Sequence, residues 1–196
     1  MLYSIGKLIL YLYFTIFRRV KIEGKENIPQ EGPVLLYANH PSAWDMFLIA
    51  VYMKRKVHYM AKAELFKSPV LSLLLKSLGA FPVSRGKGDV GSIRNVFRLL
   101  EQGKVVGIFP EGTRTPKKDP KKRKAGAAMM ALHSKAPILP VGVEWNKKIF
   151  SKVRVVFGEP FLMLPKEEGK HIPKEELILL TDEIINKIYE LIDVRE

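Results

Sequence analysis

The chain has 196 residues, of which 47% are hydrophobic and 27% charged, and it contains no Cys. This length suits one compact domain with a sizeable core, and the apolar fraction excludes global disorder. The absence of Cys excludes a disulfide scaffold, a Cys-ligated metal site and a Cys nucleophile. An excess of Lys and Arg gives a net charge of +13, which indicates a nucleic acid, an anionic membrane surface or phosphorylated substrates as partner.

The first segment, residues 2–17, is almost wholly apolar and predicts a helix. Its sixteen residues reach about 24 Å, which is short of a hydrocarbon core of about 30 Å. A narrow polar stripe beside a wide apolar face favours a helix lying in a membrane interface, with a core helix as the alternative. The polar stripe consists of Ser4, Lys7, Tyr11, Thr15 and Arg18, and the basic residues Arg19, Lys21 and Lys25 follow. Residues 1–20 are therefore expected to form a membrane-associating helix and residues 21–196 the main domain.

The remaining segments predict strands that alternate with helices. Ser68 and Asp89 have the residue types and positions of helix N-caps. Such alternation indicates one α/β domain with a mixed, largely parallel sheet flanked by helices. The expected strands are 34–38, 57–60, 81–84, 105–109, 138–144 and 152–157, and the expected helices are 42–53, 69–78, 89–102, 126–134 and 174–193.

The first candidate site is the pair His40 and Asp45, which follows the buried strand 34–38. With His40 in a turn and Asp45 near the start of a helix, the carboxylate is able to reach one imidazole nitrogen. The carboxylate then fixes the tautomer and leaves the other nitrogen as a general base. Taken alone, a capping or surface role is the preferred interpretation of this pair, because the spacing often arises by chance.

The second candidate is Phe109-Pro110-Glu111-Gly112-Thr113-Arg114, which ends another buried strand. Backbone amides, a carboxylate and a guanidinium converge there, and the planar fork of Arg suits phosphate. An ordinary charged loop is the alternative interpretation.

Two further motifs favour other classes of function. The run Gly86-Lys87-Gly88-Asp89-Val90-Gly91 has the dinucleotide-binding spacing, although we prefer a glycine loop that presents Arg85. The basic stretch Lys117 to Lys124 is the candidate for a nucleic-acid-binding module, but it lacks interleaved aromatic residues. A solvated loop, or one that contacts lipid phosphates, is the preferred interpretation of this stretch.

Taken together, the motifs resemble those of the glycerolipid acyltransferases, whose bacterial type is lysophosphatidate acyltransferase. The resemblance rests on four blocks in the family's order, within roughly residues 30–145. The blocks are Asn39-His40-Pro41-Ser42-Ala43-Trp44-Asp45, then Lys62-Ala63-Glu64-Leu65-Phe66 with Gly79 to Arg85, then Phe109 to Arg114, and finally Pro137 to Val143.

The resemblance implies a glycerol-3-phosphate acyltransferase-like fold and transfer of a fatty acyl group from acyl-CoA or acyl carrier protein to a lysophospholipid hydroxyl. It makes His40 the base and Asp45 its orienting partner. The implied acceptor-binding residues are Lys62, Arg85, Glu111, Gly112, Thr113 and Arg114. No metal and no bound cofactor are implied.

We therefore expect a monotopic enzyme on the cytoplasmic face of the cell membrane that makes phosphatidate from 1-acyl-sn-glycerol 3-phosphate. Alternative acceptors are glycerol 3-phosphate, another lysophospholipid or a lyso-aminolipid. Two alternatives from other classes are a nucleic-acid-binding module and a non-catalytic lipid-binding protein. Nucleic acid is not needed to explain the charge, because phosphate-bearing substrates and an anionic leaflet account for it.

Overall fold

A computed structural model describes residues 2–84, 89–119, 124–145, 152–165, 167 and 171–193. The strands are β1 (Arg19–Glu23), β2 (Val34–Ala38), β3 (Val57–Lys62), β4 (Phe81–Val83), β5 (Val105–Ile108), β6 (Ile138–Trp145) and β7 (Lys152–Phe157). The helices are α1 (Leu2–Phe17), α2 (Asp45–Tyr52), α3 (Pro69–Ser77), α4 (Val90–Glu101), α5 (Gly126–Ser134) and α6 (Lys174–Asp193), with short 3-10 turns η1 (Lys25–Asn27) and η2 (Ala63–Phe66).

The described strands form one seven-stranded sheet in the order β1-β7-β6-β2-β5-β3-β4. Each neighbouring pair is parallel except β6 and β7, which are antiparallel. The predicted α/β domain with a mixed, largely parallel sheet is therefore confirmed. Because β2 lies between β6 and β5, the loop that follows β2 lies at the middle of the row of strand ends. The carboxyl ends of the parallel strands are where α/β proteins bind ligands.

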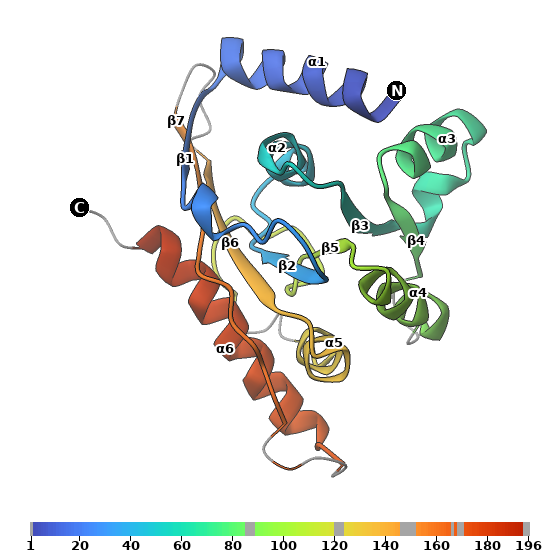
Figure 1. Ribbon diagram of the computed structural model, residues 1–196, viewed down its shortest axis with the longest axis vertical. Coiled ribbons are helices and arrows are strands. Elements are labelled where there is room, and N and C mark those ends of the chain that lie inside the picture. Colours follow the sequence, from blue (N-terminus) through green and yellow to red (C-terminus); the bar gives the residue numbers. More distant parts are fainter. Residues whose placement is uncertain are drawn as a thin grey trace.

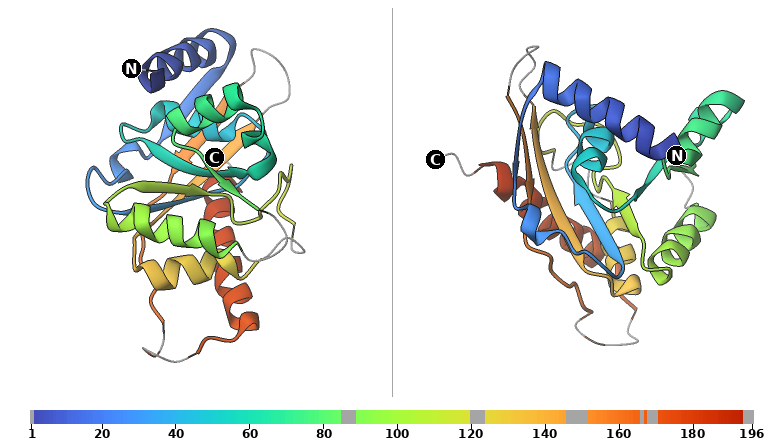
Figure 2. Two further views of the ribbon diagram at one scale, coloured as in Figure 1. Left: turned by 90° about the vertical axis from the view of Figure 1, so that its right-hand side faces the viewer. Right: turned by 45° about the horizontal axis from the view of Figure 1, so that its top comes forward.

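Helices cover both faces of the sheet, so its central strands are buried on both sides (Figures 1 and 2). In β2, Leu36 packs into the core beneath α1 and α2, whereas Leu35 and Tyr37 pack into the core beneath α4, α5 and α6. All five residues of β2 are buried, which explains why its sequence is a continuous apolar run instead of an alternating one.

The helix N-caps at Ser68 and Asp89 are confirmed. The Ser68 hydroxyl accepts a hydrogen bond from the Leu71 amide, and the Asp89 carboxylate accepts one from the Ser92 amide at 2.9 Å. The helix expected from residue 42 begins at Asp45 instead. The Asp45 carboxylate accepts a hydrogen bond from the Ser42 amide, so residues 42–44 form a turn around that carboxylate.

The sequence analysis did not predict β1, because its basic residues were interpreted as a membrane-adjacent segment. The strand pairs in parallel with β7 at the edge of the sheet, and Val20 and Ile22 pack against the core. Glu23 on β1 accepts two hydrogen bonds of 2.8 Å from the Arg154 guanidinium on β7. This bidentate pair joins two segments that lie far apart in the sequence.

The helix α1 packs on α2 and also leaves a wide apolar side exposed. Phe14 is fully buried, and Lys7, from the polar stripe, faces inward and donates a hydrogen bond to the Met53 carbonyl. On α3 only Leu75 is buried. The exposed apolar side chains are Ile5, Leu8, Ile9, Tyr11, Leu12, Ile16 and Phe17 on α1, and Val70, Leu71, Leu73 and Leu74 on α3.

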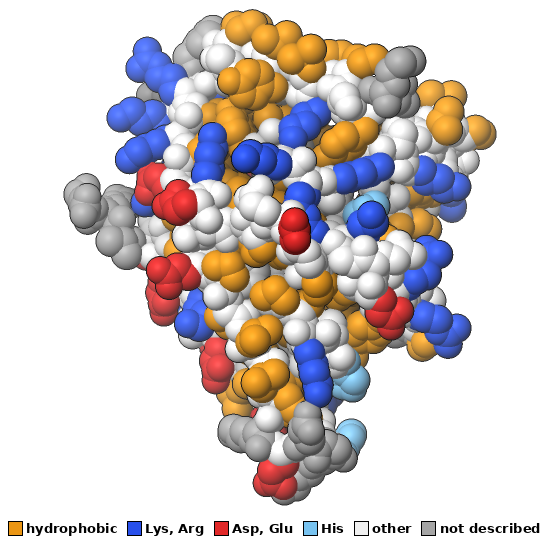
Figure 3. Space-filling model, in the orientation of Figure 1, with side chains coloured by type: hydrophobic (Ala, Val, Ile, Leu, Met, Phe, Trp, Pro, Cys, Tyr) orange, Lys and Arg blue, Asp and Glu red, His pale blue; other side chains and the backbone are white. Residues whose placement is uncertain are grey.

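Figure 3 shows apolar side chains along the α1 end of the molecule, with Lys and Arg side chains gathered just below them. Within the described part of the chain, no helix combines the length and the apolar character that are needed to cross a membrane.

Candidate active site

The candidate residues gather at the carboxyl ends of the parallel strands. His40 follows β2, Glu111 follows β5, and Lys62 is the last residue of β3. Asn39 fixes the end of β2 to β6, because its buried side-chain amide donates to the Val143 carbonyl at 2.8 Å and accepts from the Val143 amide at 2.7 Å. These two hydrogen bonds fix Asn39, the first residue after β2, and His40 follows it just beyond the sheet.

His40 and Asp45 are in contact. The His40 Nδ1 lies 2.8 Å from the Asp45 Oδ2, although the two residues are five positions apart. The His40 side chain is 13% exposed and the Asp45 side chain is fully buried. No hydrogen bond from the described residues engages the His40 Nε2, so that nitrogen is available to a substrate. The geometry is that of a general base with an orienting carboxylate.

Asp45 receives two more hydrogen bonds. The Ser42 amide donates to Oδ2 at 2.8 Å, and the Trp145 indole Nε1–H donates to Oδ1. Burial raises the pKa of Asp45, while the hydrogen bonds from His40, Ser42 and Trp145 act in the opposite direction. The carboxylate is therefore held from three sides in an environment that excludes water.

His40 is also fixed to the loop that follows β5. The Phe109 ring stacks on the imidazole with a centroid distance of 3.9 Å and an interplanar angle of 14°. The Thr115 amide donates to the His40 carbonyl at 2.9 Å. Two of the sequence blocks, far apart in the chain, are thereby joined into one site.

Glu111 points away from solvent and is 1% exposed. Its Oε1 accepts a hydrogen bond from the Tyr189 hydroxyl of α6 at 3.0 Å, and its Oε2 has no partner among the described residues. Burial and the adjacent Glu111 charge raise the pKa of Tyr189, so the hydroxyl remains a donor. The Glu111 side chain consequently anchors its loop to α6.

The next residues of this loop differ in exposure. Gly112 has a φ of +68°, which a residue with a side chain rarely adopts, and a Cβ there would lie 3.1 Å from the Lys124 Nζ. The Gly112 amide donates a hydrogen bond to the Phe109 carbonyl at 2.9 Å. The Thr113 hydroxyl oxygen is buried, and no described residue forms a hydrogen bond with it. Arg114 is exposed, so its side chain is the cationic group that this part of the loop presents.

The other predicted residues are less closely tied to this site. Lys62 forms an ion pair of 3.2 Å with Glu64, and both side chains are about half exposed. Arg85 and the first three residues of the glycine loop lie outside the described residues, as do Pro120 to Arg123 of the basic stretch. In the described part of that stretch, Lys118 donates a hydrogen bond to Asn186 of α6.

Sequence reasoning missed Trp145 and Tyr189 as parts of the site. Trp145 lies 100 positions from Asp45, and Tyr189 lies 78 positions from Glu111. Neither belongs to a recognisable local motif. Phe109 was named as the first residue of the second candidate motif, but its stacking on His40 was not predicted.

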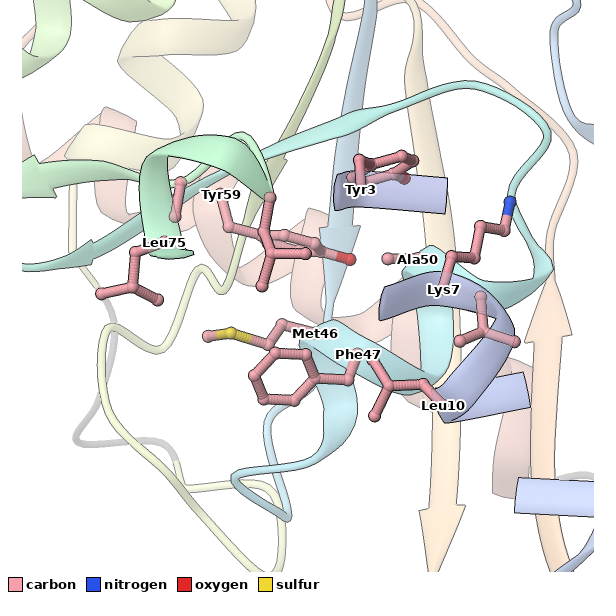
Figure 4. Close-up of a pocket in the computed structure, with 11 residues that line it drawn as sticks. Tyr3, Lys7, Leu10, Met46, Phe47, Ala50, Tyr59 and Leu75 are labelled. Carbon is pink, nitrogen blue, oxygen red and sulfur yellow. The ribbon is translucent and has the colours of Figure 1, made fainter. Parts of the chain in front are cut away.

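An apolar pocket is lined by side chains from α1, α2, β3 and α3 (Figure 4). Its empty space, with the open mouth included, measures about 450 Å³. The Tyr59 ring projects into the pocket from β3, and its buried hydroxyl has no partner among the described residues. One lining residue, Met46, follows Asp45 directly in the chain, and the other lining residues are Tyr3, Lys7, Leu10, Phe47, Ala50, Val51, Leu75, Leu78 and Ala80.

These features define a catalytic α/β domain with a histidine–aspartate pair at the carboxyl ends of its parallel strands. The chain belongs to the acyltransferase family, because the model of that family, described as Acyltransferase, matches residues 19–144. The resemblance inferred from the four sequence blocks is thereby confirmed.

Curated proteins of this family have similar sequences. The chain is 36% identical over 179 residues to the 1-acyl-sn-glycerol-3-phosphate acyltransferase of Bacillus subtilis (strain 168). This match covers 88% of this chain and 87% of that protein. It is 28% identical over 152 residues to the protein of the same name from Pseudomonas aeruginosa, and this match covers 71% of this chain and 58% of that protein.

A solved structure has the same fold. The crystal structure of the 1-acyl-sn-glycerophosphate acyltransferase PlsC from Thermotoga maritima matches with a TM-score of 0.71 at 26% identity. The match covers 100% of this chain and 79% of that chain.

Proposed function

We propose that this acyltransferase moves a fatty acyl group from acyl-CoA or acyl carrier protein to the free hydroxyl of 1-acyl-sn-glycerol 3-phosphate, giving phosphatidate. The observation that carries the proposal is the 2.8 Å contact between His40 Nδ1 and Asp45 Oδ2. The names of the similar proteins support lysophosphatidate as the acceptor.

In the proposed mechanism, Asp45 holds the Nδ1–H of His40, so the lone pair lies on Nε2. Nε2 takes the proton of the acceptor hydroxyl while that oxygen forms a bond to the thioester carbonyl carbon. The carbon–sulfur bond of the tetrahedral intermediate then breaks, and the imidazolium returns the proton to the departing thiolate. This route needs no covalent acyl-enzyme, in accord with the lack of Cys in the chain.

The acceptor phosphate is proposed to bind at the loop after β5. Arg114 presents an exposed guanidinium on this loop, Gly112 and Thr113 shape the loop beside it, and Lys62 and Arg85 are proposed as further cationic partners of the phosphate. Guanidinium groups bind phosphate oxygens in pairs, which suits this role for the two arginines. Glu111 acts on the acceptor indirectly, by fixing the loop to α6.

The apolar pocket beside Asp45 is proposed to take an acyl chain. Its lining is almost entirely aliphatic or aromatic, and one lining residue, Met46, is the neighbour of Asp45 in the chain. A chain that entered from the membrane side would then place its thioester carbonyl near His40.

We also propose that the protein is monotopic, on the cytoplasmic face of the cell membrane. The exposed apolar sides of α1 and α3 would enter the interface, and the neighbouring Lys and Arg side chains would contact anionic headgroups (Figure 3). Both substrates of the proposed reaction carry apolar chains, so this placement brings the site to its substrates.

The proposal is tested with a panel of acceptors in mixed micelles. Acyl-CoA and acyl carrier protein donors are each supplied with lysophosphatidate, glycerol 3-phosphate, a lysophospholipid with a larger headgroup, or a lyso-aminolipid, and products are quantified by mass spectrometry. We expect the rate with lysophosphatidate to exceed each of the others by at least about tenfold. A faster reaction with another acceptor would replace lysophosphatidate as the substrate, and acyl transfer to none of them would refute the proposed function.

A further inference from the structure

Trp145, the last residue of β6, reaches the catalytic pair from the far side. Its indole Nε1–H donates a hydrogen bond to Oδ1 of Asp45, while Oδ2 of the same carboxylate engages His40 and the Ser42 amide. The indole therefore takes the one carboxylate oxygen that the local turn does not hold. A carboxylate bound through both oxygens is unable to rotate about its last side-chain bond.

The indole itself is held by α1. The Phe14 ring lies 6.4 Å from the Trp145 ring, and the Arg18 guanidinium carbon lies 5.5 Å from the centroid of the same ring. Phe14 is fully buried, and its carbonyl accepts a hydrogen bond of 3.0 Å from the Arg18 amide at the end of α1. The position of the indole is therefore set by the final turn of the N-terminal helix.

We propose that Trp145 is a positioning residue of the acyl transfer: it orients the Asp45 carboxylate so that the His40 imidazole points at the acceptor hydroxyl. This inference rests on the proposed role of His40 as base. Trp145 does not contact the reacting atoms, and it acts only through Asp45. As a consequence, α1 supports the catalytic pair in addition to facing the membrane.

The first test removes the donor but keeps an aromatic ring, with Trp145→Phe. We expect kcat to fall at least tenfold, which corresponds to about 1.4 kcal/mol in the activation barrier, while KM for the acceptor stays within about twofold. Tyr52→Phe is the control, because Tyr52 also packs against an aromatic ring of α1, that of Tyr11 at 6.1 Å, and is not among the contacts described for the catalytic pair. A folded Trp145→Phe enzyme with a kcat within about twofold of wild type would overturn the proposal.

A double-mutant cycle separates positioning from general damage. If Trp145 acts through Asp45, adding Trp145→Phe to Asp45→Ala, which removes the acceptor, changes the remaining rate by less than about twofold. An undiminished loss in the Asp45→Ala background would show that Trp145 acts by another route and would overturn the proposal.

A spectroscopic measurement keeps the test valid if Trp145→Phe fails to fold or if the wild-type enzyme lacks the proposed activity. In Trp44→Phe, Trp145 is the sole tryptophan, so the fluorescence reports its indole alone. We expect Asp45→Ala to change the emission intensity of this indole, because the acceptor of its hydrogen bond is removed. An identical emission spectrum in both proteins would refute the contact, independently of any acyl transfer.

Discussion

Replacing Tyr189 by Phe removes one hydroxyl from the buried contact between α6 and the loop after β5. Glu111 is 1% exposed, and the Tyr189 hydroxyl is the only described partner of its two carboxylate oxygens. Hydrogen bonds to charged groups contribute about 1.5–3 kcal/mol to stability, and a buried acceptor that loses its donor incurs the desolvation cost. We therefore expect Tyr189→Phe to lower the free energy of unfolding by about 1.5–3 kcal/mol.

The change is measured by urea unfolding followed by circular dichroism, with the slope of the transition checked for constancy. Tyr11→Phe is the control, since the Tyr11 side chain is 44% exposed and its loss of a hydroxyl should cost less than about 0.5 kcal/mol. Because Tyr189 holds the loop that carries Gly112 and Thr113, we also expect KM for the acceptor to rise. A Tyr189→Phe protein within about 0.5 kcal/mol of wild type would refute this account of Glu111.

Two further predictions concern the sheet edge and α1. Arg154 lowers the pKa of Glu23 from its ordinary value of 4.5 to about 2, so this ion pair stabilises the fold above pH 4.5 and the contribution is lost as the pH falls toward 2. The pair is partly exposed, so Glu23→Gln should lower the free energy of unfolding by only about 0.5–1 kcal/mol at pH 7. The difference between the urea midpoints of wild type and Glu23→Gln should shrink below pH 4.5. A difference that stays constant with pH would contradict this prediction. Replacing Leu8 and Ile9 together by Asn should lower the affinity for phosphatidylglycerol vesicles, measured by sedimentation, at least about tenfold. The control is Leu179→Asn on α6, a residue that is equally exposed and whose replacement should leave this affinity unchanged. Equal effects of the two changes would argue against α1 as the membrane-facing element.

Much of the fold was predictable because the relevant signals are local. The continuous apolar run of β2 indicates a strand that is buried on both faces, and Ser68 and Asp89 cap their helices through bonds that span three residues. The contact between His40 and Asp45 was predictable for the same reason, since a turn brings them together within five residues.

The remainder depends on contacts between distant segments. The charged strand β1 has few apolar residues, and it exists as a strand because it pairs with β7, about 130 residues later. Trp145 and Tyr189 reach the site from β6 and α6, and no local spacing relates them to Asp45 or Glu111. The inward direction of Lys7 likewise depends on where α1 packs, which its own sequence does not specify.

The most direct test of the account follows thiol release from acyl-CoA in the presence of lysophosphatidate. The chain contains no Cys, so a thiol reagent meets no protein background. We expect acceptor-dependent release by wild type and by His133→Ala, an exposed histidine on α5, and a loss of about 100-fold or more in His40→Ala. Acceptor-dependent release that persists in His40→Ala would contradict the assignment of His40 as the base.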